Sequence, residues 1–321
     1  MKRLAIESQL DFFDAGADPG TAWPQAYVGL PETEDALLPT GPGPDFDTMV
    51  ETWFEPELGA YWAMTRQDAP TCFTPQMVRA LRQGQLAVAA RVRGEIASRV
   101  SNRLRYQVFG SRQPQVFSLG GDLSLFARLI RQGDRAGLLR YARECVDLVY
   151  ATATAYGLPV TTIALVQGQA LGGGFEAALA AQVVVAERHV KMGLPEVLFN
   201  MFPGMGAWQL LTRRLSPVAA ERLISGGRQH DAAELHAMGL VDVLAESGEG
   251  EEAVRRFIRS HRRHARGRAA LRRAIEASSP LDYKGMMRSV RVWVDAALEL
   301  DQRDLEIMEY LLRAQSRLGG N

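Results

Sequence analysis

Residues 167–176 read QGQALGGGFE, and they follow directly on the apolar, β-rich run PVTTIALV of residues 159–166. A run that is apolar throughout is typical of a strand buried on both faces of a sheet. The residues after the glycines, Ala177 to Ala181, favour a helix. Three glycines at a strand-to-helix junction leave N–H groups pointing outward, where they can stabilise developing negative charge. Glu176, in the first turn of this helix, would lie beside the stabilised atom.

The composition of the chain excludes several classes of partner. Its 321 residues are 47% apolar, which is enough for a substantial core. The 37 Lys and Arg residues balance the 37 Asp and Glu residues, so we expect neither nucleic acid nor a membrane surface as a partner. Cys72 and Cys145 are too few for a disulfide framework and lack the spacing of a metal site. Without an export signal or a long apolar run, the chain is predicted to be cytoplasmic.

The sequence patterns divide the chain into three parts. Residues 1–45 are rich in proline and glycine and predict an irregular extension with one short helix near residues 4–13. Residues 46–250 alternate strand and helix patterns and predict an α/β body. Residues 251–321 are helical throughout, with apolar stripes that include Trp293.

Within the α/β body the patterns predict a β-hairpin, a long amphipathic helix, and short strands that alternate with helices. The hairpin strands are residues 49–54 and 60–64, and Thr74-Pro75 begins a helix that runs to about Val100. The elements expected after it are strands at 106–110 and 116–117, a helix capped by Asp122, a helix at 137–156, a strand at 183–185, helices that begin at Ser216 and Asp231, and a strand at 241–244.

Four motifs in a fixed order resemble a known family. They are FSLGGDL at 117–123, ALGGGFE at 170–176, MGLPE at 192–196 and FPGMG at 202–206. Their order is similar to that of the crotonase superfamily, which includes the enoyl-CoA hydratases. The resemblance implies an α/β fold of the ClpP/crotonase type, a spiral of ββα units. It also implies a C-terminal helical region that walls the acyl pocket and forms homotrimers or dimers of trimers.

The resemblance also implies which residues do the chemistry. Matched position by position, it gives Gly121 and Gly173 as the amide donors of an oxyanion hole, with Glu176 and Glu196 as an acid/base pair whose individual roles stay open. The residues expected to contact substrate are Leu119, Gly120, Leu171, Gly172 and Trp293. The substrate is an acyl thioester, and no metal or redox cofactor is expected.

A narrower resemblance is to the diffusible signal factor synthases. It rests on FSLGGDL, on KMGLPEVLFNMFPGMGA at 191–207 and on MMRSVRVWV at 286–294. It implies dehydration of a 3-hydroxyacyl thioester on acyl carrier protein to a cis-2-enoyl chain, followed by release of the free acid. The N-terminal extension is longer than expected for that group. The alternatives are an ordinary enoyl-CoA hydratase or isomerase acting on CoA esters, and an inactive crotonase-like scaffold that binds a regulatory protein.

Simpler interpretations exist for several of these features. Glu176 alone would more often complement a helix dipole than act in catalysis. Residues 168–173 fit a relaxed dinucleotide-binding pattern, but no second nucleotide-binding half follows. The nine arginines of residues 255–273 are a solvated helix face, or else a docking patch for acyl carrier protein or CoA phosphates. His261 and His264 lack companion ligands, so they predict no metal site.

Overall fold

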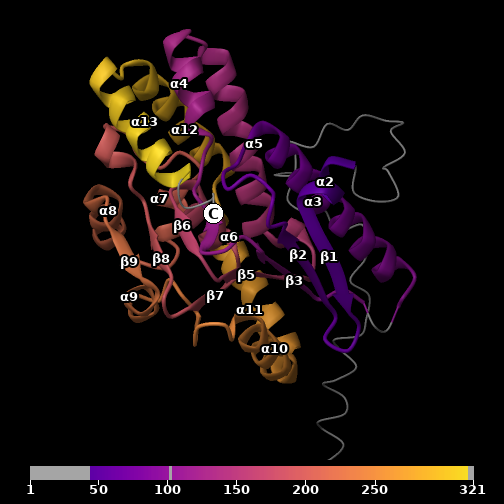
Figure 1. Ribbon diagram of the computed structural model, residues 1–321. Helices are drawn as coiled ribbons and strands as arrows, with labels where there is room; N and C mark the ends of the chain where they lie inside the picture. The colour runs from indigo at the N-terminus through magenta and orange to yellow at the C-terminus, as the bar shows by residue number, and fades with distance from the viewer. Residues whose placement is uncertain (1–43, 101–102, 317–321) are drawn as a thin grey trace, which may run out of the picture. The chain divides into compact units, whose positions relative to one another are not determined.

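A computed structural model describes residues 44–100 and 103–316, and the body of the protein is built from two β-sheets (Figure 1). The larger sheet has the order β1-β2-β3-β5-β7-β10 and the smaller the order β4-β6-β8-β9. Neighbouring strands pair in parallel except β1 with β2 and β8 with β9. The strands are β1 (Val50–Glu55), β2 (Ala60–Thr65), β3 (Tyr106–Ser111), β4 (Val116–Ser118), β5 (Thr161–Val166), β6 (Gln169–Leu171), β7 (Val183–Glu187), β8 (Lys191–Gly193), β9 (Gln229–Asp231) and β10 (Val243–Ala245).

The chain alternates between the two sheets as it advances. Strands β3, β5 and β7 lie in the larger sheet, while β4, β6 and β8, which follow them, lie in the smaller one. Each such pair is followed by helix or by a short helical turn, so the chain winds as a spiral of ββα units. This is the predicted crotonase-type α/β fold, and the prediction is confirmed.

The helices surround the sheets, and two groups of them lie at opposite ends in Figure 1, with α4, α12 and α13 at one end and α10 and α11 at the other. They are α2 (Pro44–Met49), α3 (Pro75–Ala97), α4 (Leu123–Arg131), α5 (Arg135–Ala153), α6 (Gly173–Ala180), α7 (Ala207–Leu211), α8 (Pro217–Gly226), α9 (Ala232–Ala237), α10 (Gly250–His261), α11 (Ala265–Ser278), α12 (Tyr283–Leu298) and α13 (Gln302–Ser316), with short 3₁₀ turns that include η3 (Ala155–Gly157) and η4 (Glu196–Phe199).

Strand β5 is buried on both faces, as its apolar run predicts. Ile163 and Leu165 belong to the core cluster that contains Ile258 of α10. Ala164 and Val166, which point to the opposite face, belong to the larger cluster formed with α5 and α12. Because β5 ends at Val166, the glycine segment that follows begins at a rigid, fully packed point of the fold.

The predicted helix starts are confirmed by their capping hydrogen bonds. Thr74 accepts from Met77 N at 3.2 Å, and Asp122 accepts from Leu125 N at 2.9 Å. Asp231 begins α9 with a capping box in which Glu234 accepts from Asp231 N at 3.2 Å.

Several predicted boundaries differ from the structure, and two of the differences change the interpretation. Among the described residues, Met49 ends helix α2 and does not begin a strand, and Phe46 of this helix is buried against Gly84 of α3. The helix expected to reach residue 156 ends at Ala153, since Ala155 and Tyr156 adopt positive φ angles of 49° and 59°. The short helix expected near residues 4–13, and most of the predicted extension, lie outside the described residues.

The arginine-rich segment of residues 255–273 lies along α10 and α11. Arg255 forms ion pairs with Glu55 at 2.9 Å and with Glu251 at 3.1 Å, so part of its charge is neutralised. Helix α11 buries none of its residues. Among the residues that the structure describes, no helix is long and apolar enough to cross a membrane.

Candidate active site

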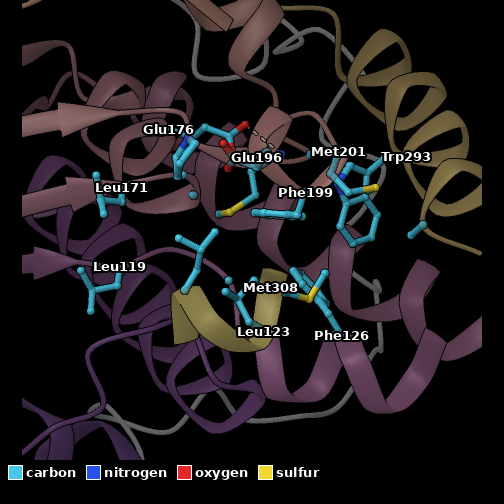
Figure 2. A pocket seen from close by; sticks show the side chains of 18 of the residues that line it. Leu119, Leu123, Phe126, Leu171, Glu176, Glu196, Phe199, Met201, Trp293 and Met308 are labelled. Atoms are coloured by element: carbon cyan, nitrogen blue, oxygen red, sulfur yellow. Dashed lines mark hydrogen bonds between the residues drawn. The ribbon is translucent and has the colours of Figure 1, made fainter. Parts of the chain in front are cut away.

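A cavity of about 230 Å³ lies where the smaller sheet, α6 and η4 meet the C-terminal helices (Figure 2). One part of its wall contains Gly121, Gly172, Gly173, Glu176 and Glu196. The rest is largely apolar and is lined by Leu123, Phe126 and Ile130 of α4, Phe199 of η4, Trp293 and Ala297 of α12, Leu300, and Met308 and Leu311 of α13. The cavity thus joins a polar, reactive region to an apolar chamber.

The two predicted amide donors lie next to each other in this wall. Gly173 is the first residue of α6, and a β-carbon added to it would lie 3.5 Å from Gly121 N. Among the hydrogen bonds of the described residues, neither the Gly121 N–H nor the Gly173 N–H donates to a protein acceptor. Both donors are therefore available to an oxygen atom in the cavity, and the start of α6 adds its dipole.

Glu176 is almost completely buried and is held in place by the FPGMG motif. Its Oε1 atom accepts hydrogen bonds from Met205 N and Ala207 N, each at 2.8 Å. Gly206 between them has a φ of 112°, which brings the backbone round into this position. Burial, and then the charge of Glu196, raise the pKa of Glu176 to about 8, although the two amide donors act in the opposite direction.

Glu196 is the first residue of η4, directly after Pro195. Within the described part of the chain its Oε2 atom is buried and has no hydrogen-bond partner. Burial raises the pKa of Glu196 to about 7. Figure 2 shows the two glutamate side chains beside each other. The pair can therefore hold one proton between two carboxyl groups near neutral pH.

The structure brings most of the predicted substrate-contacting residues to this cavity. Leu119, Leu171, Gly172 and Trp293 all line it. Gly120 does not, because it packs against the backbone: with a φ of 91°, its β-carbon would lie 2.8 Å from Leu171 O. Its position is thus structural, at the close approach of the two oxyanion-hole segments.

Several lining residues were not predicted from the sequence. Tyr141 and Cys145 of α5 line the cavity, as do Gln169 and Gln229, which form a 2.9 Å hydrogen bond with each other. Tyr141 and Cys145 are four residues apart on the buried face of a helix. That spacing is the same signal that marks ordinary core residues, so it gave no indication of a site.

Comparison with known proteins agrees with this geometry. Residues 98–283, more than half of the chain, match the family described as enoyl-CoA hydratase/isomerase. The chain belongs to this family. Within the family, it is 33% identical to methylglutaconyl-CoA hydratase of Rattus norvegicus over 163 residues, 50% of each chain. It is 29% identical to probable enoyl-CoA hydratase 2 of Arabidopsis thaliana over 226 residues, 68% of this chain and 66% of that one. The chain spans about half the length of the methylglutaconyl-CoA hydratases that it matches.

Solved structures share the fold at lower sequence identity. The enoyl-CoA hydratase of Bacillus halodurans aligns with a TM-score of 0.66 at 18% identity, covering 81% of this chain and 98% of that one. Pseudomonas aeruginosa DspI aligns with a TM-score of 0.55 at 22% identity, covering 72% and 89%. These likenesses place the chain in the crotonase fold.

Proposed function

We propose that this protein dehydrates a 3-hydroxyacyl thioester carried on acyl carrier protein and then hydrolyses the thioester, releasing a cis-2-unsaturated fatty acid of the diffusible signal factor type. The observation that carries the proposal is the arrangement of Glu176 and Glu196 beside two free amides at the reactive end of an apolar cavity. The carbonyl binds the amides, and the alkyl chain occupies the apolar chamber.

Dehydration needs one carboxylate and one carboxylic acid. The carboxylate removes the proton at C2, and the charge that develops on the thioester oxygen is stabilised by the N–H groups of Gly121 and Gly173. The electron pair then forms the C2–C3 double bond as the C3–O bond breaks, and the carboxylic acid protonates the departing hydroxyl to give water. The raised pKa values of Glu176 and Glu196 supply both protonation states in the same site.

Hydrolysis uses the same groups in a second step. A carboxylate takes a proton from a water molecule, which attacks the thioester carbonyl held by the two amides. The tetrahedral oxyanion is stabilised in the same hole, and its collapse breaks the C–S bond. The thiol leaves with the proton that the carboxylate gained. Both steps are redox-neutral acid/base chemistry, so the proposal includes no metal or redox cofactor.

The apolar chamber supports a fatty acyl substrate. Its lining from α4, α12 and α13 offers no charged partner to the chain end, and Figure 2 shows Phe126, Trp293 and Met308 facing this space. The resemblance of MMRSVRVWV, which includes Trp293, to the diffusible signal factor synthases supports the same substrate class. The proposal includes acyl carrier protein as the donor and the homotrimer, or dimer of trimers, that the family resemblance implies.

A second candidate function is reversible hydration of a 2-enoyl-CoA ester. It is favoured by the relatives, because the matched methylglutaconyl-CoA and enoyl-CoA hydratases are named for CoA esters. The chemistry is the reverse of the dehydration above and uses the same two glutamates. The two candidates differ in the carrier and in whether free acid is released.

The test is incubation of the purified full chain with 3-hydroxydodecanoyl-acyl carrier protein and, separately, with 3-hydroxydodecanoyl-CoA, followed by mass spectrometry. We expect free 2-dodecenoic acid of cis geometry from the carrier-protein substrate. We expect no product from Glu176→Gln or Glu196→Gln, both of which keep the side-chain size. Interconversion of the CoA esters without free acid would favour the second candidate. Full turnover by both variants would show that the glutamates are not the catalytic pair.

A further inference from the structure

Tyr141 of α5 lines the cavity but belongs to none of the four motifs. It is 5% exposed, and its hydroxyl makes two hydrogen bonds to the backbone. The hydroxyl donates to Phe73 O and accepts from Asp122 N at 3.2 Å. Asp122 directly follows Gly121, so one side-chain hydroxyl contacts the segment that provides the first oxyanion-hole amide.

The backbone on both sides of Gly121 is fixed, while Gly121 N–H itself is left free. Three hydrogen bonds fix it: Leu119 N to Thr71 O at 2.8 Å, Phe73 N to Gly120 O at 2.8 Å, and Asp122 N to Tyr141 Oη at 3.2 Å. The Gly121 N–H lies in the same planar peptide as Gly120 O, so the bond from Phe73 N fixes its direction, and the bond from Asp122 N fixes the peptide that follows. Tyr141 contacts both ends of this arrangement, because it also donates to Phe73 O. Of these three bonds, the one after Gly121 depends on a side chain.

Aromatic packing holds Tyr141 and Gly121 together. The rings of Phe126 and Tyr141 meet edge to face with centroids 5.3 Å apart. A β-carbon on Gly121 would lie 2.8 Å from the Phe126 ring and 3.8 Å from Tyr141 Oη. Since Phe126 also lies 5.0 Å from the Trp293 ring, the support of the oxyanion hole is continuous with the wall of the apolar chamber.

The hydroxyl of Tyr141 is not free to act on substrate. Its single hydrogen is committed to Phe73 O, and burial raises the pKa of Tyr141 well above its ordinary value. It is therefore neither a proton donor to the cavity nor an anion. Its remaining role is to hold the backbone at Asp122 and Phe73 in place.

We propose that Tyr141 is a positioning residue of the oxyanion hole, which aims the Gly121 N–H by bridging Asp122 N and Phe73 O. The inference rests on the proposed function only in assuming that an acyl thioester binds at Gly121 and Gly173. The chemical group that it serves is the thioester carbonyl, whichever carrier delivers it. Tyr141 thus contributes to carbonyl polarisation without touching the substrate.

The test compares Tyr141→Phe with Tyr283→Phe. The first change removes only the bridging hydroxyl. The second removes the hydroxyl of another partly buried tyrosine packed on α5, which donates to Asp147 Oδ1 at 2.6 Å and is not among the cavity-lining residues. Tyr141→Phe loses two hydrogen bonds and Tyr283→Phe loses one, and both variants are expected to unfold at a slightly lower temperature. Only Tyr141→Phe should change the direction of the Gly121 N–H in the oxyanion hole.

The decisive readout is the carbonyl stretching frequency of a bound, non-hydrolysable dodecanoyl thioether-ketone analogue carried on acyl carrier protein and labelled with ¹³C at the carbonyl. The wild-type protein is expected to lower this frequency relative to the free analogue. Tyr141→Phe should shift it back toward the free value and reduce kcat at least tenfold with little change in KM. The largest loss of kcat expected is roughly 10²- to 10³-fold, which is the effect of removing an oxyanion-hole donor altogether.

Two failures can be told apart by these measurements. If the wild-type protein binds the analogue without lowering the frequency, or does not bind it, the thioester site itself is wrong and the proposed function fails. If the wild-type protein polarises the carbonyl and Tyr141→Phe polarises it equally, the positioning role is wrong while the proposed function stands. An equal loss of kcat in Tyr283→Phe would also overturn the role, because it would reflect general loosening of α5.

Discussion

Gly172 and Glu196 fit each other so closely that no side chain can stand between them. A β-carbon on Gly172 would lie 2.5 Å from Glu196 Oε1, and the backbone of Gly172 has φ 54° and ψ −126°, a conformation essentially restricted to glycine. Gly172 is therefore a third residue of the QGQALGGGFE segment that affects the carboxyl pair, besides Gly173 and Glu176. It is neither an amide donor of the oxyanion hole nor an acid. It makes room for the acid.

The first prediction concerns this contact. Gly172→Ala should displace the Glu196 carboxyl and strain the start of α6, so we expect kcat to fall at least about 10²-fold, as for other small displacements of catalytic groups. The measurement is steady-state turnover of the acyl-carrier-protein substrate. Gly226→Ala, at the end of α8 where a β-carbon meets no atom within 4 Å, is the matched control. Equal activity of Gly172→Ala and the wild type would contradict the placement of Glu196.

The second prediction concerns the pH dependence of turnover. Catalysis needs one protonated and one ionised glutamate, and the pKa values of Glu176 and Glu196 are raised to about 8 and about 7. We expect kcat/KM to follow a bell-shaped profile with its maximum between about pH 7 and pH 8. Turnover that increases steadily from pH 5 to pH 9 would show that no protonated carboxyl is required.

The third prediction concerns stability. A carboxyl group whose pKa is higher in the folded than in the unfolded state binds more protons when folded, so its ionisation opposes folding as the pH rises from about 4.5 to about 8. Glu176→Gln removes that titration. The variant should be more stable than the wild type at pH 8.5 by at least about 1.4 kcal/mol, which corresponds to one unit of pKa shift, and this difference should become smaller at pH 5.

Urea unfolding of both proteins at the two pH values tests this. Glu246→Gln is the control, because it makes the same substitution at an exposed side chain that pairs with Arg188. A Glu176→Gln protein that is less stable at pH 8.5 than at pH 5, relative to the wild type, would contradict the raised pKa.

The fourth prediction concerns the wall of the apolar chamber. Asn200, which follows η4, donates a 2.6 Å hydrogen bond to Asp304, a buried carboxylate that also accepts from Asp301 N at the start of α13. Asn200 has a φ of 56°, so Asn200→Gly removes the side chain and keeps the backbone conformation. We expect the variant to lose about 1 to 3 kcal/mol of unfolding free energy, because the buried Asp304 carboxyl group loses a hydrogen-bond donor.

Hydrogen–deuterium exchange shows where that energy is lost. Exchange should become faster in α13, whose Met308 and Leu311 line the cavity, and should be unchanged in α10 at the other end of the molecule. Asp295→Asn, which weakens an exposed contact with Arg135, is the control for loss of a polar contact made by the C-terminal helices. Uniformly faster exchange in α10 and α13 would show that the contact has no local role.

The fifth prediction concerns chain length. Ala297, one turn after Trp293 on α12, is buried and lines the chamber, so Ala297→Leu fills part of the space available to the alkyl chain. We expect kcat/KM to fall at least tenfold for a dodecanoyl substrate and to change little for a butanoyl one. Val292→Leu, at an exposed position of the same helix, should alter neither value. Equal losses for both chain lengths would mean that the chamber does not hold the alkyl end.

The sequence was most informative where local patterns carry the structure. The buried strand β5, the caps at Thr74 and Asp122 and the capping box at Asp231 were all predicted, because each depends on residues close together in the chain. The ordered glycine and glutamate motifs predicted the family for the same reason. Helix α2 was missed, because Phe46 is buried by a distant glycine, Gly84, and no local pattern shows this.

Local sequence patterns thus predicted the buried strand, several helix starts, the family, and the residues that line the reactive end of the cavity. Three-dimensional packing was needed to show that Gly172 faces Glu196, that Tyr141 bridges Asp122 and Phe73, and which residues of α12 and α13 line the apolar chamber. The difference arises from the distance along the chain over which each effect acts. Periodicity and capping act over a few residues, whereas the directions of an amide, a carboxyl group and a chamber wall are set by packing between segments up to about 190 residues apart.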